Sequence, residues 1–342
     1  MSRAVRYKKH LTTLQVFLSI VLVLLTVCVL VKAFFLKAPE QKAAELPAQS
    51  AASDTDSQQS PEEQAAQEST IGTPEILRSH LERKGGFYTI LLSGLDDDNG
   101  GSDTNILVAV DTVNGYVYGV SIPRDSKAII DGKARKINYA YNKGGTELLA
   151  DTVSEQLGIP VDYTVSVNLK GFTALVDAIG GVDFDVPINM DYDDPIQNLS
   201  IHFKKGVQHL SGADALRVVR FRHNNDGSGY GSEDLGRMAT QQKFLKAVAK
   251  KMLSAGNILT KIDDYAKIFN QYVDTNLTVG NLAWLGTEVL KMGVDKIDFS
   301  TLPNAWKYPY IYLDPTETLT LVNTYLNPYV EDRTADDLNI PG

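Results

Sequence analysis

The stretch that decides the fold runs from Phe87 to Ile122 and reads FYTILLSGLDDDNGGSDTNILVAVDTVNGYVYGVSI. Three runs within it, at 87–93, 104–111 and 116–122, are rich in β-branched and aromatic residues, which predicts three strands. The Asn114-Gly115 pair separates the last two runs, and this dipeptide is a strong signal for a tight hairpin. The sequence therefore predicts an antiparallel hairpin within a larger sheet.

Helical and strand patterns alternate beyond this stretch. Because both hairpin and crossover connections occur, we expect one α/β domain at 74–331, with a central mixed β-sheet flanked by helices, and a tail at 332–342. The helices are predicted at 74–84, 146–157, 169–179, 235–253, 258–273, 281–292 and 316–326, and the further strands at 163–167, 182–186 and 298–302.

The N-terminus carries the signals of a membrane anchor. Residues 1–10 contain four basic residues and no acidic one, and the run from Leu11 to Val31 contains no charge. Its 21 residues are long enough to span a bilayer, which predicts a single transmembrane helix at 11–36. The preceding positive charges place the N-terminus in the cytoplasm and the rest of the chain outside the cell membrane. A cleaved signal peptide is the alternative.

Residues 37–73 are rich in Ala, Gln, Glu, Ser and Pro and poor in large apolar residues. Such a composition buries too little apolar surface to offset the entropy of ordering, so we expect a disordered linker. The linker would tether the extracytoplasmic domain close to the membrane.

The overall composition excludes several classes of protein. The chain has 42 acidic and 33 basic residues and a formal net charge of -9, which argues against a nucleic-acid partner. The single cysteine, Cys28, excludes a disulfide framework, a thiolate zinc cluster and a CxxC redox pair. Phosphate-binding GxxxxGK[ST], HExxH and GxSxG motifs are all missing from the sequence.

Acidic and basic residues lie where the predicted strands end. The loop GLDDDNGGSDT carries Asp96 and Asp103, and carboxylates in such loops bind hard cations, although a solvated turn has the same composition. Arg124 and Asp125 follow the hairpin's second strand, where Pro123 stops the ladder. The guanidinium there could bridge a metal-bound phosphate or simply pair with Asp125.

The segment 213–242 is the richest in polar residues. We predict that 218–222 is extended, which places Arg220 and Arg222 on one face for phosphate recognition. Asp234, Arg237 and Gln241 follow at helical spacing and line one helix face, although Asp234 alone would also serve as a helix cap. Carboxylates and arginines without a strong nucleophile suit phosphoryl-type transfer.

The motifs LLSGLD, SDTNILVAVD, SIPRDS, KINYAYNKGG, GFTALVDAIGGVDFDV, LSGADALRVVRFRH and EDLGR, with the QQ pair, occur in this order between Gly86 and Val330. Together with the predicted anchor and spacer, they resemble the LytR-CpsA-Psr family of Gram-positive cell-wall ligases. The resemblance implies an α/β/α fold. It also implies transfer of a glycopolymer, such as teichoic acid or capsular polysaccharide, from a polyprenyl-pyrophosphate carrier to peptidoglycan.

The resemblance also implies roles for individual residues. Asp96 and Asp103 match the metal-binding acids, so Mg²⁺ or Mn²⁺ is expected as cofactor. Asp103, Arg124, Asp125, Arg220 and Arg222 are expected to take part in catalysis, and either Asp103 or Asp125 would orient or deprotonate the acceptor hydroxyl. The residues expected to bind the pyrophosphate or lipid head group are Arg124, Lys136, Asn138, Arg220, Arg222, Asp234, Arg237 and Gln241.

Three positions depart from the family pattern, namely Gly101, Tyr139 and Thr240, where Arg, His and Arg are usual. Two other functions stay open at this point. One is a pyrophosphatase, in which water replaces the acceptor sugar. The other is a non-catalytic scaffold that binds the wall or the lipid, which the clustered acids and arginines disfavour because a sugar-binding module more often displays exposed aromatic residues.

Overall fold

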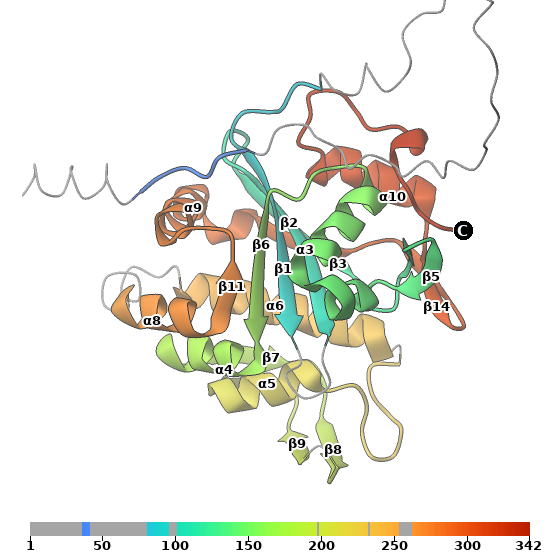
Figure 1. The fold of residues 1–342 in the computed structure, drawn as a ribbon. Helices are drawn as coiled ribbons and strands as arrows, with labels where there is room; N and C mark the ends of the chain where they lie inside the picture. The colour runs from blue at the N-terminus through green and yellow to red at the C-terminus, as the bar shows by residue number, and fades with distance from the viewer. Residues whose placement is uncertain (1–35, 42–80, 96–100, 197, 232, 253–261) are drawn as a thin grey trace, which may run out of the picture.

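A six-stranded mixed sheet forms the centre of the molecule, as predicted (Figure 1). The computed structural model describes residues 36–41, 81–95, 101–196, 198–231, 233–252 and 262–342. Strands β1, β2 and β3 pair antiparallel, β6 pairs parallel with β1, and β12 pairs parallel with β3. The strand order is β11 (Val273–Thr275), β6 (Tyr163–Asn168), β1 (Phe87–Leu95), β2 (Ser102–Asp111), β3 (Tyr116–Ile122) and β12 (Ile297–Thr301).

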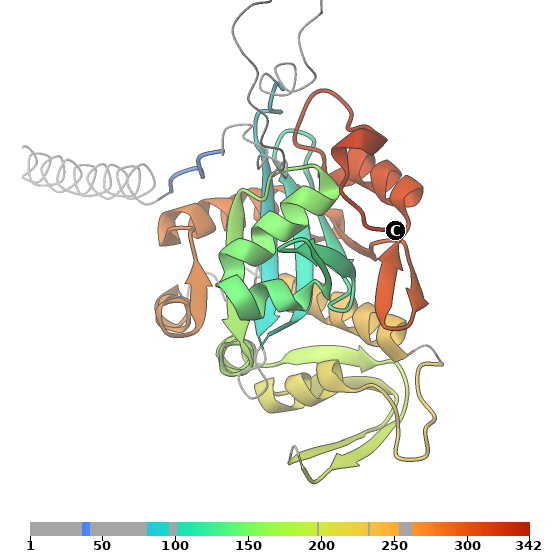
Figure 2. The ribbon, with the colours of Figure 1, turned by 45° about the vertical axis from the view of Figure 1, so that its right-hand side comes forward.

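Helices cover both faces of this sheet, and four two-stranded hairpins or ribbons surround it (Figures 1 and 2). The helices are α3 (Asn138–Leu157), α4 (Leu169–Ala178), α5 (Gly212–Arg220), α6 (Glu233–Met252), α8 (Ile262–Tyr272), α9 (Val279–Met292) and α10 (Pro315–Leu321). The small sheets pair β4 (Lys127–Ile130) with β5 (Lys133–Lys136), β7 (Val182–Val186) with β10 (Gly206–Leu210), β8 (Met190–Asp194) with β9 (Leu199–Phe203), and β13 (Asn304–Lys307) with β14 (Tyr310–Leu313).

The alternation of side chains along the central strands separates two apolar cores. Leu91 and Leu107 face α3, where they pack with Leu149 and its neighbours. Ile90 and Ile106 face the opposite side and pack with α9 and with part of α6. A third core lies where α4, α5 and α6 cover the β7–β10 ribbon. The two-sided burial explains why the central strands read as nearly continuous apolar runs.

Gly119 lies in β3 where the ring of Phe299 crosses the strand. A Cβ atom added to Gly119 would lie 2.3 Å from Cδ1 of Phe299, which is closer than van der Waals contact allows. We expect Gly119→Ala to lower the free energy of unfolding by about 1–3 kcal/mol because the ring must move within a packed core. Urea denaturation measures the change. Gly286→Ala is the matched control, since nothing lies within 4 Å of its added Cβ, and an equal loss in both variants would contradict this explanation.

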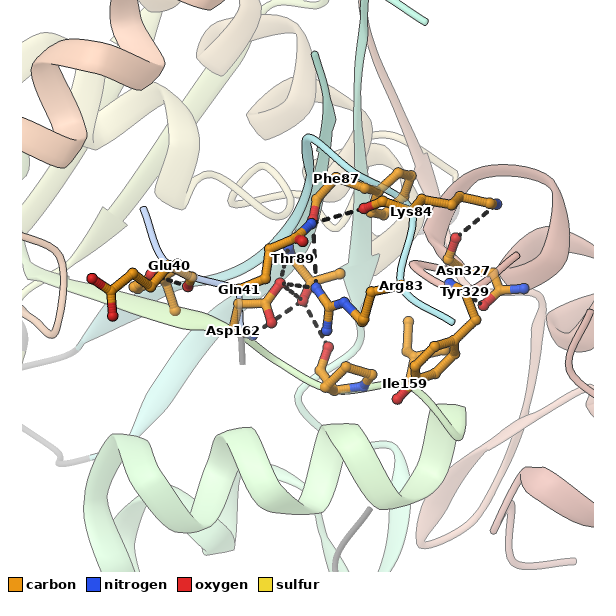
Figure 3. Close-up of polar contacts among 12 residues, drawn as sticks. Glu40, Gln41, Arg83, Lys84, Phe87, Thr89, Ile159, Asp162, Asn327 and Tyr329 are labelled. Atoms are coloured by element: carbon orange, nitrogen blue, oxygen red, sulfur yellow. Dashed lines mark hydrogen bonds and ion pairs between the residues drawn. The ribbon is translucent and has the colours of Figure 1, made fainter. Parts of the chain in front are cut away.

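Residues 36–41, most of which fall in the predicted linker, lie against the base of β1 (Figure 3). The Gln41 side-chain amide donates to the backbone carbonyls of Lys84 and Phe87, each at 2.8 Å. Asn281 donates to the carbonyl of Lys37 at 2.8 Å. The start of the predicted linker is therefore fixed to the domain at the end of the sheet where β1 begins.

None of the helices in the described ranges has the length and apolar content needed to cross a bilayer. Residues 11–35 of the predicted anchor lie outside those ranges, as do residues 42–80. The prediction that a helix continues to residue 84 is wrong, because residues 81–84 are not helical. At the other end of the chain, the predicted tail is packed on the domain. Arg333 is buried and pairs with Asp337 at 2.6 Å, and its backbone N–H donates to the Asn323 side chain at 2.7 Å.

Candidate active site

A pocket lies at the end of the sheet opposite residues 36–41. It lies where β2 begins and β3 ends, and α6 and β14 complete its wall. Five of the residues singled out from the sequence meet here. The pocket is lined by Asp103, Thr104, Asn105, Ser121, Ile122, Pro123, Arg124, Asp125, Arg237, Met238, Gln241 and Ile311.

The turn that carries Arg124 and Asp125 is held by backbone hydrogen bonds from two directions. The carbonyl of Arg124 accepts from the N–H of Asn138 at 3.2 Å, and the carbonyl of Asp125 accepts from the N–H of Ile311 at 2.9 Å. The turn itself closes with the Ser126 N–H donating to the Pro123 carbonyl at 2.9 Å. The direction in which both side chains leave the sheet is therefore set by the surrounding backbone.

Charges of opposite sign alternate across the mouth of the pocket. The Arg124 guanidinium lies 2.5 Å from the Asp103 carboxylate and 3.9 Å from that of Asp125. Asp125 also pairs with Lys136 at 3.1 Å. All four side chains are partly exposed, so an anionic ligand can reach the two cations. Lys136 and Asn138 do not line the pocket. They contact the turn that carries Arg124 and Asp125, Lys136 through its ion pair and Asn138 through its backbone N–H.

Helix α6 forms the opposite wall of the pocket, and two residues of its predicted polar face lie there. Arg237 and Gln241 are one turn apart and both line the pocket. The Gln241 amide donates to the carbonyl of Val219 at 3.1 Å, and the Gln242 amide donates to Ser121 Oγ at 3.0 Å. The QQ pair thus fixes α6 to α5 and to the sheet. Asp234 lies in the first turn of α6, and its side chain lies outside the described part of the structure.

The prediction that 218–222 is extended is wrong. Arg220 is the last residue of helix α5, and Arg222 lies in the loop after it, so the two arginines do not share a strand face. The helix is stabilised at its start, where the Ser211 side chain accepts from the N–H of Asp214, and by the Arg217–Asp214 pair at 2.8 Å. Neither Arg220 nor Arg222 lines the pocket, although the Gln241 bond to Val219 places the end of α5 beside it.

The three departures from the family pattern have separate structural consequences. Gly101 adopts a φ of 106°, a conformation that an arginine there would not adopt without strain. The Tyr139 ring lies under the Arg135 guanidinium at 5.3 Å. Thr240 is buried and lies 3.0 Å from the Tyr230 hydroxyl. Burial raises the pKa of the Tyr230 phenol, and the hydrogen bond with Thr240 opposes that rise.

The oxygen atoms beside Asp103 are of the kind that Mg²⁺ prefers. Asp103 and Asn105 both line the pocket, and the buried side-chain oxygen of Asn105 has no hydrogen-bond partner among the described residues. This donor set fits a hard cation in its chemistry. Asp96, the other predicted ligand, lies outside the described residues, and within them no three His, Cys, Asp or Glu side chains form a group able to hold a metal ion.

Sequence reasoning missed several residues that line the pocket. Asn105 follows Asp103 within the SDTN motif and was not singled out, although its position near the strand end was a usable signal. Met238 follows Arg237 on α6 and is apolar. The polar residues at helical spacing that were singled out on this helix therefore did not include it. Ile311 reaches the pocket from β14, and no local pattern connects it to Asp125.

The motifs that carry the family resemblance lie in the same part of the chain as the residues that line the pocket. A model of the LytR_cpsA_psr family matches residues 44–326. The chain belongs to the LytR-CpsA-Psr family. The pocket described above lies within the residues that the family model matches.

Curated members of the LytR-CpsA-Psr family share moderate identity with this chain. A Bacillus subtilis (strain 168) protein, polyisoprenyl-teichoic acid–peptidoglycan teichoic acid transferase TagV, is 37% identical over 202 residues, which cover 56% of this chain and 50% of TagV. The transferase TagU of Bacillus cereus (strain ATCC 14579) is 37% identical over 212 residues, which cover 60% of this chain and 64% of TagU. The match thus spans less than two thirds of the length of either relative.

Solved structures of the LytR-CpsA-Psr family have the same fold. The crystal structure of B. subtilis TagV aligns with a TM-score of 0.60 and 31% sequence identity, covering 70% of this chain and 96% of the TagV chain. The central mixed sheet flanked by helices is therefore shared, and the predicted α/β fold class is confirmed.

Proposed function

We propose that this protein is a membrane-anchored phosphotransferase that attaches a secondary cell-wall glycopolymer to peptidoglycan. The observation that carries the proposal is the pocket at the sheet end, where Arg124 and Arg237 converge beside Asp103 and Asp125. A compact group of guanidinium and carboxylate groups suits the binding of a pyrophosphate. The names of TagV and TagU, which describe transfer of teichoic acid from a polyisoprenyl carrier to peptidoglycan, support the same reaction class.

In the proposed reaction, a sugar hydroxyl of peptidoglycan, the muramic acid C6-OH, attacks the phosphorus that bears the polymer. A new bond forms between the acceptor oxygen and that phosphorus, and the bond to the carrier's phosphate breaks. Asp103 or Asp125 accepts the hydroxyl proton and passes it to solvent, and polyprenyl phosphate leaves. Arg124 and Arg237 would hold the phosphate oxygens, since guanidinium donors neutralise the charge that such a transfer spreads over them. Asp125 would hold Arg124 and Lys136 in place through its ion pairs.

We also propose that a divalent cation, Mg²⁺ or Mn²⁺, binds at Asp103 with Asp96 and neutralises phosphate charge when bound. The oxygen donors of Asp103 and Asn105 at the pocket support this assignment. Asp103 would then have two contacts, the cation and Arg124, which places the guanidinium beside the same phosphate group.

The proposed cellular arrangement follows from the N-terminal sequence. Residues 11–36 would cross the cell membrane once, with residues 1–10 in the cytoplasm and the domain outside. The lipid-linked polymer and peptidoglycan, which are the proposed partners, are reached from that side. The overall charge of -9 agrees with an absence of nucleic-acid partners.

The proposal is tested with the full-length protein in liposomes that contain a polyprenyl-pyrophosphate-linked polymer, to which purified peptidoglycan is added. We expect a covalent polymer–peptidoglycan product that requires both substrates, detected by size separation after muramidase digestion. Release of free polymer without a covalent product would instead identify the protein as a pyrophosphatase. No turnover of the carrier with normal folding would support the non-catalytic scaffold.

Removal of divalent cations should stop the reaction if the cation assignment is right. We expect EDTA to lower the initial rate of polymer transfer in the same liposomes by at least about tenfold, because the phosphate charge is no longer neutralised. Excess Mg²⁺ should restore the rate. A rate that is unchanged by EDTA would contradict the assignment of Asp96 and Asp103.

A further inference from the structure

The β13–β14 hairpin displays large aromatic side chains to solvent. Trp306 is 68% exposed and Tyr308 is 81% exposed, and their rings meet edge to face with centroids 6.3 Å apart. Exposed aromatic side chains that gather in one place on a soluble surface mark a site of interaction. The aromatic ledge, defined as Trp306 and Tyr308, is therefore a candidate binding surface outside the pocket.

This hairpin is joined directly to the pocket. Ile311 lines the pocket, and its backbone N–H donates to the carbonyl of Asp125 at 2.9 Å. On the other side of the hairpin, the Tyr310 hydroxyl donates to the carbonyl of Ala134 in β5 at 3.2 Å. Figure 1 shows β14 and β5 next to each other at the edge of the molecule. The aromatic ledge thus has a fixed position relative to Arg124 and Asp125.

Basic side chains are exposed on the hairpin that carries the aromatic ledge and on the neighbouring strand β5. Lys307 lies between Trp306 and Tyr308 in the sequence and is exposed, and Lys133 and Arg135 are exposed on the neighbouring β5. The Nζ atom of Lys307 lies 5.9 Å from the centre of the Tyr312 ring, which keeps the cation close to the hairpin. In a chain of net charge -9, this local excess of positive charge favours a ligand that carries negative groups.

We propose that the aromatic ledge binds the glycan strand of peptidoglycan, the acceptor in the proposed function, on which this inference rests. Aromatic rings present flat apolar faces that match the C–H faces of pyranose rings at a low cost in conformational entropy. The exposed lysines and arginine of this hairpin and of β5 match the carboxylates of the peptide stems. A strand held on Trp306 and Tyr308 would extend towards Ile311 and deliver a sugar hydroxyl to Arg124 and Asp125.

The experiment measures binding separately from transfer. Full-length protein in nanodiscs without lipid-linked polymer is sedimented with purified sacculi stripped of secondary polymer. We expect the double variant Trp306→Ala/Tyr308→Ala to bind at least about tenfold more weakly, and Trp306→Phe/Tyr308→Phe to keep most of the affinity. Val113→Ala, which removes an apolar side chain that is 73% exposed on the β2–β3 turn, is the control and should bind like the unmodified protein.

The same variants are then assayed for transfer at varied peptidoglycan concentration. The double alanine variant should raise KM for peptidoglycan with little change in kcat and no change in affinity for the lipid-linked polymer. Sacculus binding that is unchanged in the double variant would overturn the inference, and so would a loss of affinity for the lipid-linked polymer with sacculus binding intact. If the unmodified protein shows no transfer activity but binds sacculi more tightly than the double alanine variant, the proposed function is refuted. The inference that the aromatic ledge binds peptidoglycan is then supported.

Discussion

Replacement of Arg124 by lysine is expected to lower kcat/KM for polymer transfer by about 100-fold or more, the scale of loss seen when one donor to a developing oxyanion is removed. Lysine keeps the positive charge but loses the planar set of donors that can bind two phosphate oxygens at once. The backbone of Arg124 is fixed by Asn138 and its side chain by Asp103, so a shorter reach or a different head group cannot be corrected by movement of the turn.

The measurement is the initial rate of transfer by full-length protein in liposomes, and the control is Arg217→Lys. Arg217 forms a comparable ion pair with Asp214 at 2.8 Å but does not line the pocket. We expect the control to transfer polymer at the unmodified rate. Both variants should melt within about 1 °C of the unmodified protein, because partly exposed ion pairs contribute little to stability. Equal rates in Arg124→Lys and Arg217→Lys would contradict the proposed role of Arg124.

Local patterns were sufficient to predict one strand of the central sheet, β3, and one strand of the β7–β10 ribbon, β7. The structure has β3 at Tyr116–Ile122 and β7 at Val182–Val186, with the same bounds as predicted. Both strands are preceded by a glycine turn and followed by a proline, so the signal lies within a few residues. Gly144 and Gly145 interrupt α3, which the sequence placed only from residue 146 onward.

Residues 218–222 show where a local pattern is ambiguous. Apolar and basic residues alternate there as in a strand, yet Ser211 begins a helix that continues to Arg220. The capping hydrogen bond and the acidic first turn favour the helix over the short alternation. A cap seven residues before the ambiguous stretch was therefore the signal that the sequence interpretation needed.

The candidate site was partly predictable for a related reason. Asp103, Arg124 and Asp125 lie at the ends of strands joined by a recognisable hairpin, so their meeting follows from local structure. The hairpin that carries Ile311 and the aromatic ledge is joined to the pocket by a bridge between Ser126 and Ile311, which are far apart in the chain. Tertiary packing decides that contact, and no spacing in the sequence encodes it.

The base of the sheet holds the residue whose loss should be most costly for folding. We expect Asp162→Ala to lower the free energy of unfolding by about 3–5 kcal/mol, the range observed when one partner of a buried ion pair is removed. Asp162 is buried, and its Oδ2 atom accepts from Arg83 Nη2 at 2.8 Å and from the Thr89 N–H at 2.9 Å (Figure 3). Its removal leaves the nearly buried Arg83 guanidinium without that carboxylate.

Removal of Asp162 should weaken more than one ion pair, because β1, the segment around Tyr329 and residues 36–41 all lie close to Arg83. Its guanidinium lies 5.9 Å from the centre of the Tyr329 ring, while Gln41 binds the carbonyl of Phe87 at the start of the same strand. We expect the melting temperature to fall by roughly 10 °C in Asp162→Ala, measured by calorimetry. Asp298→Ala, which removes an exposed partner of Lys246 at 3.1 Å, should change it by less than about 3 °C. Similar melting temperatures for the two variants would show that the buried network does not hold the base of β1 to the rest of the domain.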